Sequence, residues 1–554
     1  MISIEDLRAV PLFADVPIEE LTRLVQSSGD LRLEVGDYAA HEGDERALCV
    51  VLSGQLEVTK LVDGVRRTIG ARGPSQIFGE VPIIFGIPFQ GSFHAKEPSR
   101  VMRVEARVFH SLAAAAPEVL TRLAALARER IGGLQGIATV PAVARAVIVG
   151  HQWDTACHAL RSFLDRNRIT FDWVTPDSPD LAAKWLGPTL GAGDLPAARC
   201  ADGTVLLRAE TRDLARCVGL QTRPAETEYD TVIIGGGPAG LAAAVYGASE
   251  GLRTIVVERE APGGQAGTSS RIENYLGFPT GVSGDELSRR ALEQAQRLGA
   301  EILLTRTVVG IETDPRAVLL DGGERLRART IVIATGVSWR RLAIEGFDRL
   351  LGKGVYYGAS RSDASTTQGS DVHLIGAGNS AGQAAIHFAN HADTVSLVVR
   401  GAALESSMSH YLIEQLRKKP NVRVELRSEV QAVQGDQHLT SIDTINHATG
   451  VVRRHKSGGV FVFIGADAET AWLSNEIARD ARGYVLTGEA VTRDGNWRLE
   501  RDPYLLETNV PGIFACGDVR ASLVKRVAAA VGEGSMAIAF IHQFLARTAQ
   551  AATR

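Results

Sequence analysis

The chain has 554 residues, of which 45% are apolar and 22% are charged, and its formal net charge is −4. These values are ordinary for a globular protein of about three or four domains, and the charge gives no reason to expect nucleic-acid binding. No apolar run reaches the roughly 20 residues that span a bilayer, and no signal peptide is evident, so we expect a cytoplasmic protein.

The five cysteines lie at positions 49, 157, 200, 217 and 516, and none of them forms a CxxC pair. No Cys/His cluster has metal-ligand spacing, so no metal site is expected. A disulfide framework is not expected at this size in a reducing compartment, and we expect most of the cysteines to be small buried residues.

Residues 1–135 are predicted to form short strands, at 47–52 and 54–58, followed by a helical stretch over 108–131. The segment resembles the cyclic-nucleotide-binding β-roll in the residues Leu12-Phe13, Ser53-Gly54 and Phe78-Gly79-Glu80. This resemblance implies that Glu80 accepts a hydrogen bond from a ribose hydroxyl.

The same resemblance implies an arginine about ten positions after Glu80, and this chain has Gln90 there. Without that arginine a cyclic phosphate loses a charge-assisted contact commonly worth about 1.5–3 kcal/mol. Cyclic-nucleotide sensing therefore stands beside a structural, dimerising or differently liganded β-roll. No helix-turn-helix is evident after the β-roll, which excludes a transcription factor of that kind.

Residues 142–222 are predicted to form a small α/β unit. We expect strands at 145–149 and 170–174, helices at 157–166 and 211–218, and a hairpin at Asp202-Gly203. The order resembles a thioredoxin or glutaredoxin fold, with Pro196 at the expected proline. The dithiol would fall at 154–157, where only Cys157 is a cysteine, so the unit is interpreted as a degenerate spacer or docking domain. A lone redox thiol at Cys157 is the alternative.

Two glycine fingerprints follow apolar strands and precede alanine-rich helices. The first is Gly235-Gly236-Gly237-Pro238-Ala239-Gly240 and the second is Gly376-Ala377-Gly378-Asn379-Ser380-Ala381. Such glycines permit a tight turn, a close approach of backbone N–H groups to a pyrophosphate, and close packing of helix on strand. Two fingerprints in this context predict one flavin and one nicotinamide nucleotide bound by the same chain.

The segment from Thr227 to about residue 546 resembles the low-molecular-weight thioredoxin reductase family. The matching stretches are Gly263-Gly264-Gln265, Glu273-Asn274-Tyr275, Ile333-Ala334-Thr335-Gly336, the run 459–465, Ala515-Cys516-Gly517-Asp518 and Arg526-Val527-Ala528. In this family Asp518 would bind the ribityl chain of FAD. Cys516 lies inside that motif and is interpreted as packing rather than chemistry.

Acidic and basic strand ends distinguish the two nucleotide sites. Glu258 ends the second strand, at the offset where a carboxylate holds a ribose hydroxyl. Arg400 takes the corresponding place after the second fingerprint, where a guanidinium can pair with a 2′-phosphate, so NADPH is favoured over NADH. The family usually has two adjacent arginines there, whereas Gly401 follows Arg400 in this chain.

Together the fingerprints and the resemblance give a set of cofactor-binding positions. They are Gly235, Gly237, Pro238, Ala239, Gly240, Glu258, Arg259, Gly264, Gln265, Asn274, Val308, Thr335, Gly336, Gly376, Gly378, Asn379, Ser380, Ala381, Arg400, Gly517, Asp518, Arg526, Val527 and Ala528.

The thiols of the family's reaction are missing. The dithiol is expected shortly before the second fingerprint, and Gly358 and Arg361 occupy its positions. Neither residue forms a thiolate, so the usual relay from flavin to disulfide is not available and we name no catalytic side chain.

These observations predict an α/β flavoprotein with two dinucleotide-binding folds, preceded by a β-roll and a thioredoxin-like unit. The expected domains are 1–135, 142–222, an FAD-binding part at 227–344 and 459–546, and an NADPH-binding part at 345–458. This layout resembles bacterial fusions of a cyclic-nucleotide-binding domain with a thioredoxin reductase. Hinges are expected near 336–345 and 457–459, because such enzymes commonly swing the NADPH-binding part.

Three functions stay open. The first is an NADPH-oxidising FAD enzyme that reduces an acceptor such as a ferredoxin, flavodoxin, quinone or external disulfide. The second is a redox or ligand sensor in which a small effector at the β-roll gates flavin reduction. The third is a flavin-binding scaffold with little turnover. A homodimer is expected from the family resemblance.

Overall fold

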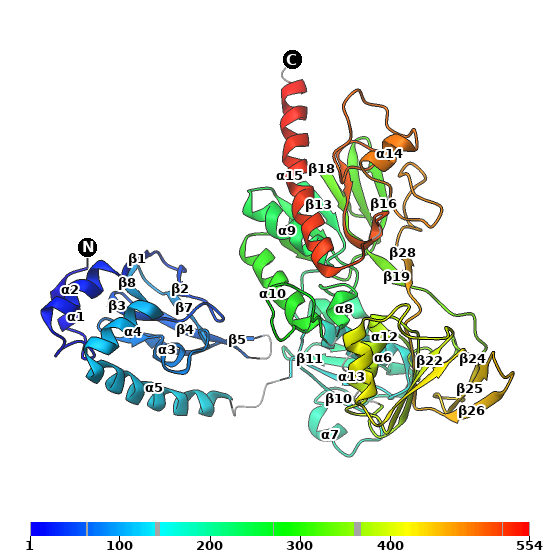
Figure 1. The fold of residues 1–554 in the computed structure, drawn as a ribbon, viewed down its shortest axis with the longest axis horizontal. Helices are drawn as coiled ribbons and strands as arrows, with labels where there is room; N and C mark the ends of the chain where they lie inside the picture. Colours follow the sequence, from blue (N-terminus) through cyan, green and yellow to red (C-terminus); the bar gives the residue numbers. More distant parts are fainter. Residues whose placement is uncertain are drawn as a thin grey trace. The chain divides into compact units, whose positions relative to one another are not determined.

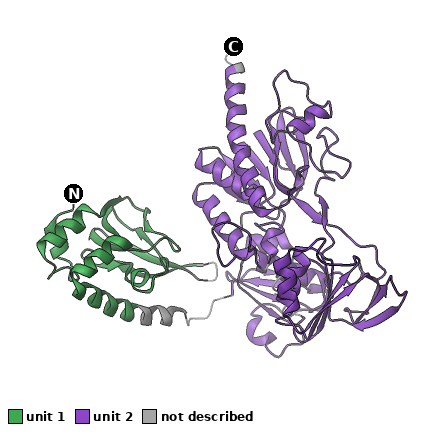
Figure 2. Cartoon of the chain, in the orientation of Figure 1, with its two compact units in different colours: residues 1–143 green, residues 144–554 purple. Residues whose placement is uncertain are grey.

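The computed structural model describes residues 2–62, 65–138, 144–269, 271–358, 367–522 and 524–552 (Figure 1). The chain divides into two compact units, Met1–Val143 and Ala144–Arg554, which are coloured separately in Figure 2.

The N-terminal unit contains two four-stranded antiparallel sheets, with strand orders β1-β8-β3-β6 and β2-β7-β4-β5. The rings of Phe78, Phe89 and Phe93 pack in its core. The strands are β1 (Gly29–Leu33), β2 (Tyr38–Ala40), β3 (Ala47–Ser53), β4 (Leu56–Val62), β5 (Val65–Arg72), β6 (Ile77–Phe78), β7 (Ser92–Ala95) and β8 (Ser99–Glu105).

The helices of this unit are α1 (Ile4–Arg8), α2 (Ile18–Gln26), α3 (Glu80–Phe85), α4 (Ala106–Ala115) and α5 (Pro117–Ala138). The single helical stretch predicted over 108–131 is wrong in one respect, because it consists of the two helices α4 and α5. Ala116 leaves the helical conformation, and Pro117 begins the second helix, a position at which the missing N–H of proline costs nothing.

The second unit begins with a four-stranded sheet of order β10-β9-β11-β12, in which β9 and β10 are parallel and β11 and β12 are antiparallel to their neighbours. The peptide bond Leu195–Pro196 is cis. Both features agree with the predicted thioredoxin-like order. The elements are β9 (Ala146–Val149), α6 (Thr155–Arg166), β10 (Phe171–Val174), α7 (Leu181–Lys184), η1 (Ala192–Asp194), β11 (Ala197–Cys200), β12 (Val205–Leu206) and α8 (Thr211–Cys217).

We call the segment formed by these elements, residues 144–222, the middle segment. No disulfide framework was expected, but Cys200 on β11 and Cys217 at the end of α8 are disulfide-bonded, with Cα atoms 6.1 Å apart. The cysteines are 17 positions apart, and only the folded sheet and helix bring them together.

A seven-stranded sheet carries the first fingerprint. Its order is β15-β14-β13-β18-β17-β16, and β29 pairs with β18. The strands are β13 (Glu228–Ile234), β14 (Thr254–Val257), β15 (Glu301–Leu303), β16 (Val308–Thr313), β17 (Arg316–Leu320), β18 (Arg325–Ile333) and β29 (Ile513–Ala515). The helical elements of this part of the chain are α9 (Pro238–Ser249), η2 (Ala266–Thr268), α10 (Gly284–Arg297), α14 (Glu489–Arg493), η3 (Gly517–Val519) and α15 (Val527–Ala552).

A second, parallel sheet of order β20-β27-β21-β22-β23 carries the second fingerprint. It is inserted between β18 and β29, as predicted. Its elements are β20 (Val355–Tyr357), β21 (Asp371–Ile375), α12 (Asn379–Phe388), β22 (Thr394–Val399), α13 (His410–Arg417), β23 (Val422–Leu426) and β27 (Gly459–Val462). A further antiparallel sheet consists of β24 (Ser428–Gln434), β25 (Ser441–Asn446) and β26 (Val452–Lys456).

The two crossings between the large sheets pair with each other, as β19 (Val337–Trp339) and the antiparallel β28 (Ala466–Ala468). The predicted boundary and hinge near residue 459 differ from this arrangement. The strand β27 pairs with β20 and β21 and completes the second sheet, so the chain returns to the first sheet only after Val462. A buried apolar strand, read without its partners, does not show which sheet it joins.

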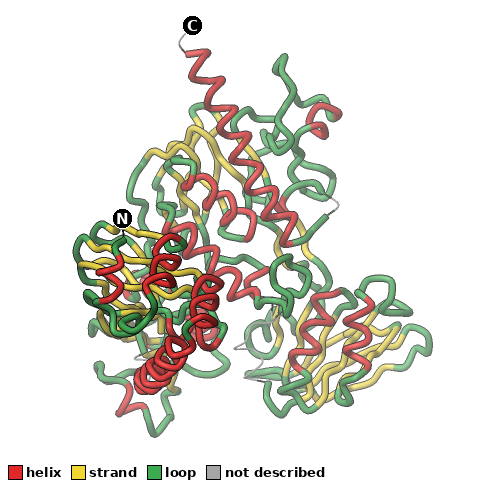
Figure 3. Tube along the Cα trace, turned by 60° about the vertical axis from the view of Figure 1, so that its left-hand side comes forward, coloured by secondary structure: helices red, strands yellow, loops and turns green. Residues whose placement is uncertain are grey.

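The C-terminal helix α15 packs along α9, and Figure 3 shows it as the long red helix that ends at the C-terminus. Within the described residues, Val527–Gln550 is the single stretch that is long and apolar enough to cross a membrane, judged by length and composition alone. Ile538 and Ile541 of the helix are fully buried in the core beside the first sheet.

Candidate cofactor-binding site

The first glycine turn links β13 to α9, and its glycines meet different demands. Gly235 has φ +104°, and a Cβ on it would lie 2.5 Å from the carbonyl oxygen of Ala334. A Cβ on Gly240 would lie 1.9 Å from the Gly235 oxygen, so helix and strand touch through bare backbone. At Gly237, the N-cap of α9, a Cβ would meet nothing within 4 Å. The turn is therefore open at the helix start, where a pyrophosphate is predicted.

Pro238 and Ala239 form the first turn of α9. Pro238 stands at the start of the helix, where its fixed φ suits the helical conformation. Ala239 is buried, and a Cβ on Gly517 or on Gly534 would lie less than 3 Å from it. These small residues let α9 approach both η3 and α15.

The predicted ribose carboxylate lies beside this turn. Glu258 directly follows β14 and is 8% exposed. Its Oε2 accepts a hydrogen bond from the N–H of Gly236 at 2.7 Å, and its Oε1 accepts one from Glu260 at 2.8 Å. Burial raises the pKa of Glu258, and the two N–H donors oppose this shift. Arg259 pairs with Glu469 at 3.2 Å, and its role toward the cofactor stays a prediction.

Asp518 has the environment expected of a group that binds hydroxyls. It lies in η3 directly after Gly517, whose φ is +76°. Burial raises the pKa of Asp518, whereas the Lys525 ammonium lowers it. Among the residues that the structure describes, none donates a hydrogen bond to this carboxylate. Its acceptor oxygens therefore fit the ribityl hydroxyls of FAD.

Two residues missed by sequence reasoning support Asp518. The Lys525 Nζ donates to the carbonyl oxygens of Asp518 and Arg520, each at 2.7 Å, and lies 4.3 Å from the centre of the Tyr484 ring. The buried Glu533 accepts a hydrogen bond from the Gly517 N–H at 2.7 Å. A charged residue in the otherwise small, apolar stretch 527–534 was the available signal for Glu533.

The loops predicted to wrap the flavin touch the first turn. A Cβ on Gly264, which has φ +54°, would lie 3.2 Å from the Gly237 Cα. The Gln265 Nε2 donates to the carbonyl oxygen of Val337, at the crossing between the sheets. The stretch with Gly264 and Gln265 thus lies next to the first glycine turn, although the two motifs are separate in the sequence.

The remaining predicted FAD positions are more scattered. The Thr335 hydroxyl donates to the carbonyl oxygen of Glu469 at 3.0 Å, and Gly336, with φ +68°, has open space where a Cβ would lie. Val308 is buried at the start of β16, and Asn274 is exposed. The open space at Gly237 and Gly336 leaves room for FAD. The carboxylates of Glu258 and Asp518 can accept hydrogen bonds from its hydroxyl groups.

The second glycine turn repeats the first with one difference. Gly376 has φ +144°, and a Cβ on it would lie 2.3 Å from the Phe463 carbonyl oxygen. Gly378 caps α12, and a Cβ on it would meet nothing within 4 Å. Ala381 replaces the third glycine and is fully buried, so this helix packs at a distance that accepts a methyl group.

The residues after Gly378 differ in exposure. The Asn379 Oδ1 accepts a hydrogen bond from the Ser409 N–H at 2.7 Å, which ties the turn to α13, and Ser380 is exposed. Arg400 follows β22, and its side chain is 84% exposed, with Nη1 3.8 Å from Glu429 Oε1. This long contact leaves the guanidinium donors available for a 2′-phosphate.

One residue of α13 links the NADPH-binding part to a stretch predicted to wrap the flavin. Tyr411 of α13 hydrogen-bonds with Gln383 of α12 and with Glu273 of the FAD-binding part, and the charge of Arg526 also acts on it. Burial raises the pKa of Tyr411, a hydrogen bond with Gln383 lowers it, and the Glu273 carboxylate raises it. The helix α13 of the NADPH-binding part therefore contacts a stretch that is predicted to wrap the flavin. Arg526 is exposed there, while Val527 and Ala528 begin α15.

The predicted dithiol region is described only in part. Gly358 follows β20 with φ +84°, and a Cβ on it would lie 3.3 Å from the Trp339 Nε1. Arg361 lies outside the described residues. The thiol of Cys157 is fully buried, which raises its pKa to about 11, and burial also raises the pKa of Cys516. Thiols of this kind are poor nucleophiles at neutral pH.

Glu80, the β-roll residue that would bind a ribose hydroxyl, already forms an ion pair within the β-roll unit. Glu80 is 4% exposed, and its Oε2 lies 2.9 Å from the Nη1 of Arg130 on α5. The Gln90 amide donates to the carbonyl oxygen of Pro88 at 2.9 Å, within its own loop. Gln90 therefore does not replace the arginine that the β-roll resemblance implies about ten positions after Glu80.

Two dinucleotide folds, one inserted in the other, define a flavoprotein oxidoreductase that uses a nicotinamide nucleotide. The chain belongs to the pyridine nucleotide-disulphide oxidoreductase family, whose profile matches residues 229–534. The profile of the cyclic nucleotide-binding domain matches residues 31–116.

Several known proteins are similar to the second unit. The chain is 32% identical to the 34.2 kDa protein in the rubredoxin operon of Clostridium pasteurianum, over 58% of the chain and 98% of that protein. It is 31% identical to the thioredoxin reductase of Treponema pallidum, over 56% and 95%. It is 35% identical to an alkyl hydroperoxide reductase component of Staphylococcus epidermidis, over 56% of this chain but only 57% of that one.

Among solved structures, the thioredoxin reductase of Lactococcus lactis in its FR conformation matches with a TM-score of 0.51 and 30% identity, over 58% of this chain and 99% of that one. The thioredoxin reductases of this family use FAD and NADPH. The chain is thus a thioredoxin-reductase-like flavin oxidoreductase, although its sequence has no CxxC pair.

Proposed function

We propose that the chain oxidises NADPH through bound FAD and passes the electrons to an acceptor outside the chain. The observation that carries the proposal is the hydrogen bond of Tyr411 on α13 with Glu273 of the FAD-binding part, which brings the NADPH-binding part up to a stretch predicted to wrap the flavin. Bound FAD would supply the hydride-accepting chemistry at that place.

The side chains of this protein bind and orient. The turns at Gly237 and Gly378 present helix starts to the two pyrophosphates, and Glu258 and Asp518 accept from sugar and ribityl hydroxyls. Arg400 selects the 2′-phosphate of NADPH. The glycine at 358 and the buried Cys157 take no electrons, because neither supplies a reactive thiolate.

The proposed electron acceptors lie outside the chain because the chain has no CxxC thiols to receive the electrons. The proposed acceptors are a ferredoxin or flavodoxin, a quinone, or a disulfide on another protein. The relatives named thioredoxin reductase and alkyl hydroperoxide reductase support a disulfide-type acceptor, whereas the missing CxxC pair of this chain favours an acceptor that needs no thiol intermediate. A homodimer in the cytoplasm is part of the same proposal.

The first test is an anaerobic titration of the purified protein with NADPH and, separately, with NADH, followed by the visible absorbance of the flavin. Prompt bleaching with NADPH and little with NADH is the expected result. The matched control is Arg400→Ala, which keeps both folds and removes the proposed phosphate contact. No bleaching by either nucleotide would contradict the proposal.

A second function is a sensor in which the β-roll gates flavin reduction. The match of residues 31–116 to a cyclic nucleotide-binding domain favours it, and the engaged Glu80 and the loop-bound Gln90 count against the usual ligand. The rate of flavin reduction by NADPH, measured with and without cyclic AMP or cyclic GMP, distinguishes the two. A ligand-dependent rate would favour the sensor.

A further inference from the structure

One helix of the middle segment contacts both dinucleotide-binding parts of the second unit. The helix α6 has 12 residues, which makes it about 18 Å long. Its first turn lies against the NADPH-binding part, and the residues at its end lie against the FAD-binding part. A rigid element held at both ends fixes the distance between the two bodies that it touches.

Aromatic contacts hold the N-terminal end of α6. The Trp153 ring, just before the helix, stacks on the His438 ring of the β24–β25 connection, with centroids 5.0 Å apart and an interplanar angle of 15°. The His158 ring lies 5.6 Å from that of Tyr356, which is buried in the core of the NADPH-binding part. Thr155 lies beside Gly352, because a Cβ on that glycine would be 3.8 Å from the Thr155 Cγ2.

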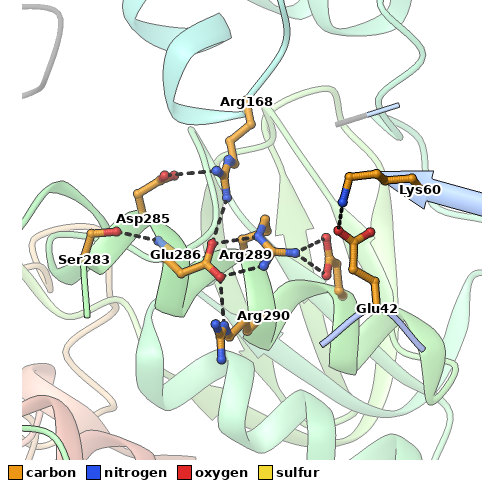
Figure 4. A network of polar contacts seen from close by, with 9 residues as sticks. Glu42, Lys60, Arg168, Ser283, Asp285, Glu286, Arg289 and Arg290 are labelled. Atoms are coloured by element: carbon orange, nitrogen blue, oxygen red, sulfur yellow. Dashed lines mark hydrogen bonds and ion pairs between the residues drawn. The ribbon is translucent and has the colours of Figure 1, made fainter. Parts of the chain in front are cut away.

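Ion pairs hold the C-terminal end of α6. Arg166 pairs with Glu260, two residues after the predicted ribose carboxylate, and the Asn167 amide donates to the Glu260 carbonyl oxygen at 3.2 Å. Arg168 lies 3.5 Å from Asp285 and 3.6 Å from Glu286, both at the start of α10 (Figure 4).

A second anchor ties the end of the middle segment to the same part. The Arg212 guanidinium of α8 donates to the Thr305 carbonyl oxygen at 3.0 Å and pairs with Asp321. Asp321 also pairs with the buried Arg306 at 2.9 Å. The middle segment therefore has two separate attachments to the FAD-binding part, and its first turn reaches the NADPH-binding part.

The reaction explains why a fixed orientation is useful here. Where a dithiol and a nicotinamide site lie on the same mobile part, one flavin cannot meet both at once, and that part must swing between them. In this chain Gly358 holds no thiol, so a second orientation has no chemistry to perform. In the observed orientation Tyr411 already hydrogen-bonds with Glu273, in a stretch predicted to wrap the flavin.

We propose that α6 is a strut, with Trp153 and His158 as positioning residues, and that the enzyme both reduces its flavin and passes on the electrons without leaving this orientation. The inference rests on the proposed function. Two electrons and one proton leave NADPH as hydride for the flavin, and two ferricyanide ions then take one electron each, with release of the proton.

The experiment joins α6 to the NADPH-binding part with a disulfide in the full-length FAD-loaded protein, using Thr155→Cys together with Gly352→Cys. Peptide mapping establishes the cross-link, and Thr155→Cys alone, oxidised in the same way, is the matched control. Flavin reduction by NADPH and steady turnover with ferricyanide are measured before cross-linking, after it, and after reduction and desalting.

The cross-linked enzyme is expected to reduce its flavin and to turn over within about twofold of the same variant with free thiols. Turnover that falls about tenfold or more, while one round of flavin reduction survives, would overturn the strut, and so would loss of flavin reduction on cross-linking. Failure of the wild-type protein to accept electrons from NADPH is a different result, because it contradicts the proposed function itself.

A second variant tests the strut by loosening it. Trp153→Ala removes the stack on His438, and Lys184→Ala, which breaks an ion pair with Asp172 within the middle segment, is the control. The limiting rate of flavin reduction at saturating NADPH is expected to fall by about twofold or more relative to the wild type and to Lys184→Ala, with the half-saturating NADPH concentration unchanged. An unchanged limiting rate, or faster turnover, would overturn the proposal.

Discussion

Two alanine substitutions in the first glycine turn separate its structural role from its role toward the cofactor. In Gly240→Ala the new Cβ would lie 1.9 Å from the Gly235 oxygen, so helix and strand must part by at least 1.1 Å to reach 3.0 Å. Overpacking of this kind typically costs about 1–3 kcal/mol, and a backbone oxygen yields less readily than a side chain, so we expect about 3 kcal/mol. In Gly237→Ala the Cβ meets nothing within 4 Å and φ is −72°, which alanine adopts freely.

The assay is thermal unfolding of both variants as apoprotein, followed by titration with FAD. Gly240→Ala is expected to lower the apoprotein Tm by about 6–12 °C, the shift that 3 kcal/mol gives in a domain of 150–250 residues. Gly237→Ala is expected to leave the apoprotein Tm unchanged and to weaken FAD binding by about tenfold or more, because the methyl group occupies the approach of the pyrophosphate.

The reverse pattern would refute this reasoning. An apoprotein Tm that falls in Gly237→Ala but not in Gly240→Ala would mean that the glycines do not divide their roles as the contacts indicate. The second fingerprint supplies an internal control, since the buried Ala381 already carries a methyl group at the position equivalent to Gly240. Ala381→Gly is expected to leave the NADPH-binding part folded.

Three further perturbations test the nicotinamide site and the stability of the second unit. Arg400→Ala is expected to raise the KM for NADPH by roughly tenfold and to leave the KM for NADH unchanged, since it removes one charge-assisted phosphate contact; an equal change for both nucleotides would contradict it. Burial and the nearby His455 lower the pKa of His373 to about 4, so the neutral ring stabilises the fold fully above pH 6.5, and about 3 kcal/mol is lost as the pH falls from 6.5 to 4. His373→Asn should flatten the pH dependence of the Tm over that range, and a variant with the wild-type slope would refute the assignment. Cys200→Ser should cost about 3 kcal/mol, the loop-closure value for 17 residues, in urea unfolding without reductant, and wild type and variant should coincide in reductant.

The sequence predicted the elements that local patterns define. The strand that leads to Glu258 and the helices at both fingerprints appear where glycine turns and apolar runs placed them. The strand order of the middle segment also agrees with the resemblance, and the bond before Pro196 is cis. In these cases the signal lies within a short stretch of chain, where hydrophobic periodicity and turn chemistry are informative.

Features that depend on distant partners were not predictable. The strand β27 looks the same in sequence whichever sheet it joins, and the Cys200–Cys217 pair requires β11 and α8 to be packed together. The buried role of Glu533 depends on the N–H of Gly517, on another element. Long-range pairing of this kind is decided by tertiary packing, which one sequence does not reveal.

The strut depends on the same kind of long-range information. Nothing in the local sequence of Trp153 or Arg168 indicates that the two ends of α6 touch different bodies. In the sequence alone, nothing connects the missing cysteine at position 154 with the missing cysteine at position 358. In the structure, the first turn of α6 and the strand that leads to Gly358 lie in contact, through His158 and Tyr356.

This contact bears on where electrons can leave. A thiol relay would have to pass from the flavin through position 358 toward position 157, and Gly358 and the buried, weakly acidic Cys157 interrupt it at both steps. The Cys200–Cys217 disulfide lies at the other end of the middle segment's sheet, since Cys200 pairs with Ala146 whereas the cis-proline end of β11 pairs with Val149. Under the proposed function, electrons therefore pass from the flavin directly to the acceptor, and an acceptor that needs no thiol intermediate, such as a quinone or a ferredoxin, meets this requirement more simply than a thioredoxin.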